Sequence, residues 1–202
     1  MNDDRLLIDH FAPRFDFTRV EHQLAELPAI EAIEAMRSLD LLTVRSPLTD
    51  LATGIRTLPE RLGRPRGPAP PPMRLAGLFD AHSDASELLD WVGLDEERGR
   101  QIVFGAVGMF WRPKIVWRTV PVEEFSAFAE PGWGKIVASI VAQPYGGVRS
   151  VLTYEARTIL FDDLSRRSFG RYWTLVSPFA GVIMRAALKT ATGGVRSDPL
   201  RT

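Results

Sequence analysis

The feature that most constrains this chain is a helical pattern that runs from Asp162 to Ala191. At 100° per residue, its apolar side chains fall on one side of a helix and its basic side chains on the other. About 30 residues make a rod of about 45 Å, which is longer than the usual globular helix. The apolar side is wide and aromatic, so a large curved surface must cover it. It holds Phe169, Tyr172, Trp173, Val176, Phe179, Ala180, Ile183, Met184 and Ala187.

Signals at both ends of this stretch support the helix. Asp162 or Asp163 can cap its first turn, and Gly193-Gly194 follow its last turn. The residues before it, Val151–Phe161, alternate as in a β-strand. The polar side carries Arg167, Arg171, Thr174, Arg185 and Lys189. This part of the sequence therefore predicts a strand that leads into one long amphipathic helix.

The first part of the sequence predicts one strand and two short helices. Phe15–Ala25 alternates as a strand, and Pro28 suits the first turn of a helix that follows it. Leucine and isoleucine recur at helical spacing from Leu48 to Leu62, although Pro59 should end a regular helix there. Gly63–Pro72 is rich in proline and predicts an exposed, extended loop. The loop is either an ordinary connection or a ligand for a proline-binding partner.

From Met73 the apolar pattern changes to the period of strands. Short turns join these strands, and strands joined by short turns form an antiparallel sheet. The turn Asp95–Gly99 suits a hairpin, and Pro121 opens a short helix. The predicted strands are Glu87–Leu94, Gln101–Phe110, Ile115–Val120, Trp133–Ala142 and Val148–Phe161. A sheet followed by a long helix predicts an α+β fold.

Composition narrows the function. The 202 residues are expected to form one domain, 1–202, with flexible tails at about 1–14 and 192–202. The formal net charge is zero, so we expect no nucleic-acid partner. No apolar run approaches the roughly 20 residues of a membrane span, so we expect no stable membrane insertion. The chain has no cysteine and no signal-peptide pattern at its start, which favours a cytoplasmic location.

The residue types and motifs of the chain give no indication of a metal or cofactor site. Cysteine ligands and a thiol nucleophile are excluded because the chain contains no cysteine. His10, His22 and His82 are far apart and lack the spacing of metal ligands. No nucleophile-elbow or phosphate-loop motif occurs in a suitable context. We therefore expect no cofactor and no metal.

Two runs of sequence carry a family resemblance: FGAVGMFWRP (Phe104–Pro113) and TYEARTILFDDLSRRSFGRYWTLVSPFAGVIMRAAL (Thr153–Leu188). The second run contains Glu155-Ala156-Arg157 and Arg171-Tyr172-Trp173. It resembles uncharacterised bacterial members of the START/Bet v1-like (SRPBCC) superfamily. The resemblance implies a helix-grip fold, in which a curved antiparallel sheet wraps around a long C-terminal helix. It also implies a cavity for lipids, polyketides or similar apolar molecules; some members catalyse cyclisation or dehydration, but no single catalytic residue is shared.

Glu155 and Arg157 are the first candidate site residues. Because they are two residues apart on one predicted strand, their side chains lie on the same face of the sheet. They would serve as a polar anchor inside an apolar cavity, because such pockets use a few placed polar groups to orient a ligand. The alternative is a cross-strand ion pair on the outer side of the sheet.

The remaining candidates are apolar. Tyr172, Trp173, Val176, Phe179 and Ile183 share the inward side of the helix, where they form either the floor of a cavity or an ordinary core. Trp111 lies at a strand end and forms either a lid over a pocket or edge packing. Gly105 interrupts an apolar strand, and a strand glycine marks a bend, a bulge or a close backbone approach.

These residues favour the binding or carriage of a small hydrophobic molecule of lipid, polyketide or aromatic type. The alternative is a cofactor-free cyclase, dehydratase or isomerase, in which Glu155, Arg157, Tyr154 and His22 meet in the same cavity. Its catalytic residues are not identified by any motif. A protein-interaction module that uses the proline-rich loop is a third possibility, and the sequence names no protein partner.

Overall fold

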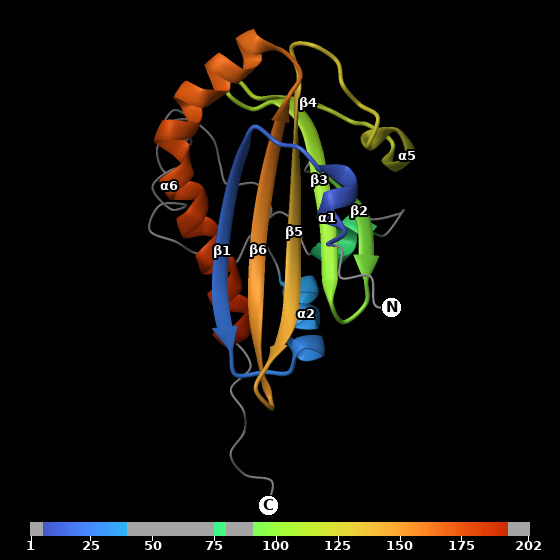
Figure 1. The fold of residues 1–202 in the computed structure, drawn as a ribbon, viewed down its shortest axis with the longest axis vertical. Coiled ribbons are helices and arrows are strands. Elements are labelled where there is room, and N and C mark those ends of the chain that lie inside the picture. Colours follow the sequence, from blue (N-terminus) through green and yellow to red (C-terminus); the bar gives the residue numbers. More distant parts are fainter. Residues whose placement is uncertain (1–5, 40–74, 80–90, 194–202) are drawn as a thin grey trace, which may run out of the picture.

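The computed structural model describes residues 6–39, 75–79 and 91–193. It has an α+β fold in which a curved antiparallel sheet lies beside one long C-terminal helix (Figure 1). In chain order the elements are α1 (Ile8–Phe11), β1 (Phe17–Ala25), α2 (Ala29–Ser38), η2 (Leu75–Phe79), β2 (Trp91–Glu97), β3 (Gln101–Met109), β4 (Val116–Arg118), α5 (Val122–Phe125), β5 (Gly134–Tyr145), β6 (Arg149–Leu160) and α6 (Asp163–Gly193).

The strand order is β1-β6-β5-β3-β2, and β4 also pairs with β3. All pairs are antiparallel, and the register aligns Phe17, Thr158, Ile136, Ala106 and Trp91 in one row across the sheet. Two strands share one edge of β3: β2 pairs with it up to Ala106, and β4 pairs with it from the next residue onward. One edge of β3 therefore has a break at the point where β2 and β4 meet.

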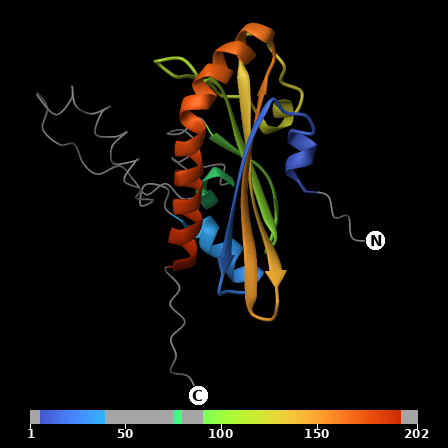
Figure 2. The ribbon, with the colours of Figure 1, turned by 60° about the vertical axis from the view of Figure 1, so that its left-hand side comes forward.

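Helices cover both sides of the sheet (Figure 2). The inner face, as we call it, packs against α6 and α2, and the outer face packs against α1 and α5. Because successive strand side chains alternate between faces, Tyr154 and Ala156 lie on the inner face while Glu155 and Arg157 lie on the outer face. This alternation determines which side chains can meet a molecule between the sheet and α6.

The inner face has two filled clusters, one toward each end of α6. At one end, Ile33 and Met36 of α2 pack with Leu188 of α6 and with inner-face residues such as Ile140 and Leu152. At the other end, the buried residues are Phe110, Leu160 and Phe169. Burial of a full aliphatic or aromatic side chain contributes about 1.5–3 kcal/mol. These clusters therefore hold both ends of α6 to the sheet.

The outer face buries a short N-terminal helix. Ile8 and Phe11 of α1 are buried against Val103, Val107 and Val137 of the sheet. On the same face, the Lys135 ammonium donates to the carbonyl oxygens of Phe125 and Ser126 at 3.2 and 3.0 Å, and burial lowers its pKa. The expectation of a flexible tail over residues 1–14 is wrong for α1, because its apolar side chains belong to the core.

Asp162 caps the start of α6. Its Oδ1 accepts from the backbone N–H of Ser165 at 2.8 Å, and its Oδ2 accepts from the Ser165 hydroxyl at 2.7 Å and from the Gly132 N–H at 2.6 Å. These hydrogen bonds lower the pKa of the Asp162 carboxyl from 3.8 to about 2, and the bond from the Ser165 hydroxyl has the largest effect. The cap therefore joins the start of α6 to the turn before β5.

The Asp162 cap is expected to make stability depend on pH. A carboxyl whose pKa is lower in the folded state stabilises the fold above its unfolded pKa, and this stabilisation disappears as the pH falls from 3.8 toward about 2. We expect Asp162→Asn to melt below the wild type at neutral pH, and the difference to shrink in this acidic range. Thermal unfolding followed by circular dichroism measures both. Asp163→Asn, a change at the next residue, is the control. If the difference in melting temperature between Asp162→Asn and the wild type stayed the same at acidic pH, the Asp162 carboxylate would not be the titrating cap.

The sequence predicted these elements with small errors in their bounds. The run of antiparallel strands and the long helix are confirmed, and α6 begins one residue after its predicted capping position. The β2–β3 turn lies later than predicted, since β2 continues to Glu97. The second amphipathic helix and the proline-rich loop Gly63–Pro72 lie outside the described residues.

Candidate functional site on the inner face

The middle of the inner face carries short side chains. Ala138 pairs with Ala156 across β5 and β6, and Ala106 of β3 lies beside Ile136. Although β5 and β6 are central strands, Ile136 and Ala156 are only half-buried. We call Ala106, Ile136, Ala138 and Ala156 the inner patch. It adjoins both filled clusters, because Ala138 belongs to the first and Ile136 packs against the second.

Aromatic side chains surround the inner patch. Their ring centroids follow one another at 6.3 Å from Tyr154 to Phe104, 5.6 Å from Phe104 to Trp91 and 6.5 Å from Trp91 to Trp117. On the other side, Trp173 of α6 lies 6.1 Å from Phe17 of β1. We call these six residues the aromatic rim. The separations suit edge-to-face and tilted ring contacts, so the rim presents both ring faces and ring edges.

Tyr154 places a hydroxyl beside the inner patch. Burial raises its pKa to about 12, yet its side chain is not fully enclosed. Among the described residues, the hydroxyl has no hydrogen-bond partner. A tyrosine hydroxyl both donates and accepts, so it provides a position for a ligand group that accepts or donates a hydrogen bond.

A charged network borders the patch on the β1 side. Both Arg19 Nε and Nη2 donate to Glu21 Oε1, at 2.7 and 2.5 Å, and Arg185 Nη1 donates to Glu21 Oε2 at 2.6 Å. Burial would raise the pKa of Glu21, but the hydrogen bonds from the two arginines outweigh it and the pKa is lowered. Glu21 lies opposite Tyr154 in the register. The network therefore fixes α6 to β1 beside the tyrosine.

Gly181 allows this close approach of α6 to β1. A Cβ at this position would overlap the Arg19 guanidinium and would lie 2.6 Å from Glu21 Oε1. We expect Gly181→Ala to be less stable than Gly170→Ala by about 1–2 kcal/mol, because both gain the helix preference of alanine but only Gly181→Ala displaces these groups and weakens a partly buried network. Urea denaturation measures the change.

Gly170→Ala is the matched control on the same helix. Its Cβ would meet Phe17 Cζ at 3.5 Å, an ordinary contact. Alanine is favoured over glycine within a helix by about 1 kcal/mol, so we expect Gly170→Ala to be neutral or stabilising. If both variants changed stability equally, the contact between Gly181 and the Arg19–Glu21 pair would not be the cause.

The predicted site residues on α6 differ in how deeply they are buried. Tyr172, Trp173 and Val176 are half-buried, and Trp173 stacks on Phe169 with centroids 5.7 Å apart. Phe179 and Ile183 are 46% and 40% exposed, so the prediction that they lie on the buried side of the helix is wrong. The buried residues of this part of α6, Gly181, Met184 and Leu188, lie on another side of the helix from Phe179 and Ile183.

Glu155 and Arg157 lie on the outer face, away from α6. Arg157 Nε donates to Glu155 Oε1 at 2.7 Å, and its Nη1 donates to Asp9 Oδ1 at 2.6 Å and to the Ala12 carbonyl at 2.9 Å. The prediction that Glu155 and Arg157 anchor a ligand between the sheet and the helix is therefore wrong. The two residues form an ion pair on the outer face, as the alternative predicted, and Arg157 also binds Asp9 and Ala12 of the N-terminal segment.

Gly105 and Trp111 also have packing roles. Gly105 faces outward, where Phe125 Cζ would lie 2.6 Å from an added Cβ, so the close approach is made by α5. This corrects the expectation that Gly105 meets a ligand. The Trp111 ring packs edge-to-face on Phe110 and Phe169, with centroids 5.4 and 6.1 Å apart. Trp111 thus extends the cluster at the start of α6.

Sequence reasoning missed Arg19, Glu21 and Arg185. The sequence did contain a signal for Arg19 and Glu21: they are two residues apart, as Glu155 and Arg157 are on the neighbouring strand, with the order of the two charges reversed. The register shows why only one pair faces α6: Arg19 lies opposite Ala156, so the two pairs are offset by one residue and point to opposite faces. His22 is exposed on the outer face, where its Nδ1 lies 2.9 Å from Thr153 Oγ1.

Comparison with known proteins finds neither a matching family model nor a curated relative for this sequence. Within the described ranges, no group of three histidine or acidic side chains could hold a metal ion. Within the same ranges, no helix is long and apolar enough to cross a membrane.

Proposed function

We propose that this is a helix-grip protein of START/Bet v1 type that binds a small apolar molecule between the inner patch and α6. The proposal depends chiefly on the half-buried Ile136 and Ala156, which lie in central strands. Central-strand apolar side chains are normally fully covered, and a contiguous uncovered apolar surface marks a binding site. The resemblance of Thr153–Leu188 to that superfamily supports the same assignment.

The chemistry of the surroundings favours an aromatic ligand with one polar group. Ile136 and Ala156 leave apolar surface uncovered on the inner face, and the aromatic rim offers ring edges and faces at its border. Trp173 and Val176 supply the opposite wall from α6. The Tyr154 hydroxyl would bond the polar group, as in other apolar pockets that orient a ligand with few polar contacts.

Binding is favoured over catalysis by the positions of the polar side chains. Of Glu155, Arg157, Tyr154 and His22, only Tyr154 lies on the inner face. The charges near the patch, Arg19 and Glu21 of β1 and Arg185 of α6, already bond one another. The acid–base set on which an enzymatic role was predicted therefore does not meet at the inner patch.

Native mass spectrometry of the purified protein, before and after organic extraction, tests the proposal. We expect a bound apolar compound, and after extraction we expect 2-naphthol to bind when followed by titration calorimetry. Ala156→Leu fills the patch and should weaken 2-naphthol binding at least roughly tenfold, equivalent to about 1.4 kcal/mol. Tyr154→Phe removes one neutral hydrogen bond and should weaken it about fivefold.

Ala127→Leu is the matched control, because Ala127 is exposed on the segment after α5. It should bind 2-naphthol as the wild type does. Wild-type affinity in the Ala156→Leu variant, with an unchanged melting temperature, would overturn the proposal.

A further inference from the structure

A separate pocket of about 340 Å³ opens at the edge of the sheet, beside α5. Val92 and Val107 line it from the outer face, and Val120 and Phe125 line it from the segment around α5. Trp91 and Arg118 complete the walls. The volume lies near the lower end of the range for small-molecule sites, which suits a compound of one or two rings.

The pocket results from the break along the edge of β3. Trp91 pairs with Ala106 at the start of β2, and Arg118 pairs with Val107 at the end of β4. Beyond Arg118 the chain turns through Pro121 into α5 instead of continuing beside β3. The end of β4 and the start of β2 therefore lie next to each other, and the pocket occupies the space between them and α5.

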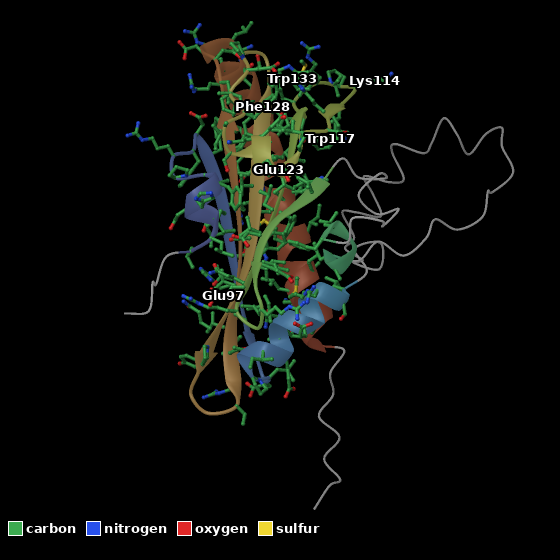
Figure 3. The ribbon with its side chains drawn as sticks, turned by 90° about the vertical axis from the view of Figure 1, so that its right-hand side faces the viewer. Glu97, Lys114, Trp117, Glu123, Phe128 and Trp133 are labelled. Carbon is green, nitrogen blue, oxygen red and sulfur yellow. The ribbon has the colours of Figure 1, made fainter. Side chains whose placement is uncertain are left out.

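Arg118 is held in one orientation at this pocket. Its Nη1 and Nη2 both donate to the Glu130 carboxylate, the second at 2.8 Å. The guanidinium also lies 5.1 and 5.4 Å from the ring centroids of Phe128 and Trp133. Figure 3 shows these two aromatic residues at the same end of the sheet as Trp117, far from Glu97 at the β2–β3 turn.

Arg118 has N–H donors left over for further hydrogen bonds. Arginine carries five N–H donors, and within the described chain Nε has no partner. The carboxylate of Glu130 balances the positive charge, so a neutral acceptor is favoured over a second anion. Apart from Thr119, the other lining residues are apolar, and Trp91 and Phe125 are the aromatic ones.

We propose that this edge pocket is a second binding site, for a small, uncharged aromatic carbonyl compound whose oxygen accepts from Arg118. The pocket opens on the outer face, where Val92, Val107 and Phe125 lie, and Ile136, Tyr154 and Ala156 do not line it. Of the inner patch, Ala106 also lines this pocket. The second site does not depend on the proposed function. Trp91, which belongs to the aromatic rim, forms a wall common to both.

Acetophenone and ethylbenzene form a matched pair of probes, because they have nearly the same shape and only acetophenone has a carbonyl. Ligand-observed NMR on the full chain measures both affinities. We expect acetophenone to bind about fivefold more tightly, the effect of one hydrogen bond. Arg118→Met keeps the aliphatic stem and should make the two affinities equal.

Two filling variants test the location. Thr119 is exposed and Val122 half-buried, and both line the pocket, so Thr119→Trp and Val122→Trp should each weaken acetophenone binding at least tenfold. Val116→Trp is the control, because Val116 lies on β4 outside the pocket and is already exposed. Acetophenone binding that survives both filling variants would overturn the proposal. So would loss of binding in Ala156→Leu alone, which would assign the probe to the inner patch.

Discussion

Replacing Arg157 with methionine is expected to lower the free energy of unfolding by about 3 kcal/mol and to release α1 from the sheet. The Arg157 side chain is 10% exposed and bonds Glu155, Asp9 and the Ala12 carbonyl. Removing the cation leaves the Glu155 carboxylate, 13% exposed, without its charged partner. An uncompensated charge in such a position costs more than the pair contributes, which is why the effect is large.

Urea denaturation gives the change in stability, and hydrogen exchange of the amides in α1 reports its release. The control is the double variant Glu155→Met/Arg157→Met, which removes both charges. It should recover part of the loss, since the Glu155 carboxylate is gone and the Asp9 carboxylate, which also loses its partner, is 47% exposed. If the single and double variants are equally destabilised, the cost comes from loss of the guanidinium over the Phe15 ring, whose centroid lies 4.8 Å away.

Gly105→Ala is expected to lower the free energy of unfolding by about 2–3 kcal/mol, although it adds only one methyl group. The new Cβ would lie 2.6 Å from Phe125 Cζ and 2.8 Å from the Ile136 carbonyl oxygen. The oxygen belongs to the backbone of a central strand and has little freedom to move. Overpacking at such a contact forces either α5 or β5 to shift.

A double-mutant cycle with Phe125→Leu separates the two contacts. If the aromatic ring is the main obstacle, Gly105→Ala should cost less in the Phe125→Leu background, with a coupling of about 1 kcal/mol. Equal costs in both backgrounds would attribute the effect to the Ile136 carbonyl. A melting temperature unchanged by Gly105→Ala would contradict both explanations.

The sequence predicted the elements of this fold because its periodicities are long and regular. The pattern from Asp162 to Ala191 can satisfy only a helix, and the paired strand patterns after Trp91 can satisfy only hairpins. The four-residue helix α1 was missed, since four residues carry almost no periodic signal. Its position depends on Arg157, more than 140 residues away in the chain.

The site was harder to predict because periodicity does not identify the face that a helix covers. Glu155 and Arg157 share a face by spacing alone, but their assignment to the outer face follows from Tyr154 and Ala156 packing toward α6. The network of Arg19, Glu21 and Arg185 also forms only in three dimensions. Trp173 was predictable from the helical stripe, whereas Phe179 and Ile183 were not, because the buried residues of that part of α6 lie on another side of the helix.

The pairing of β1 with β6 has a consequence for how the protein is made. Thr18 donates to Ala156, a residue 138 positions later in the sequence, so β1 stays without β6, its partner among the described strands, until β6 has been synthesised. Contacts of such long sequence separation form slowly. β1 therefore leaves the ribosome before the other described strands and is among the last of them to be paired, and α6, which covers it, follows immediately. Closure of this edge and arrival of the long helix become a single late event in folding.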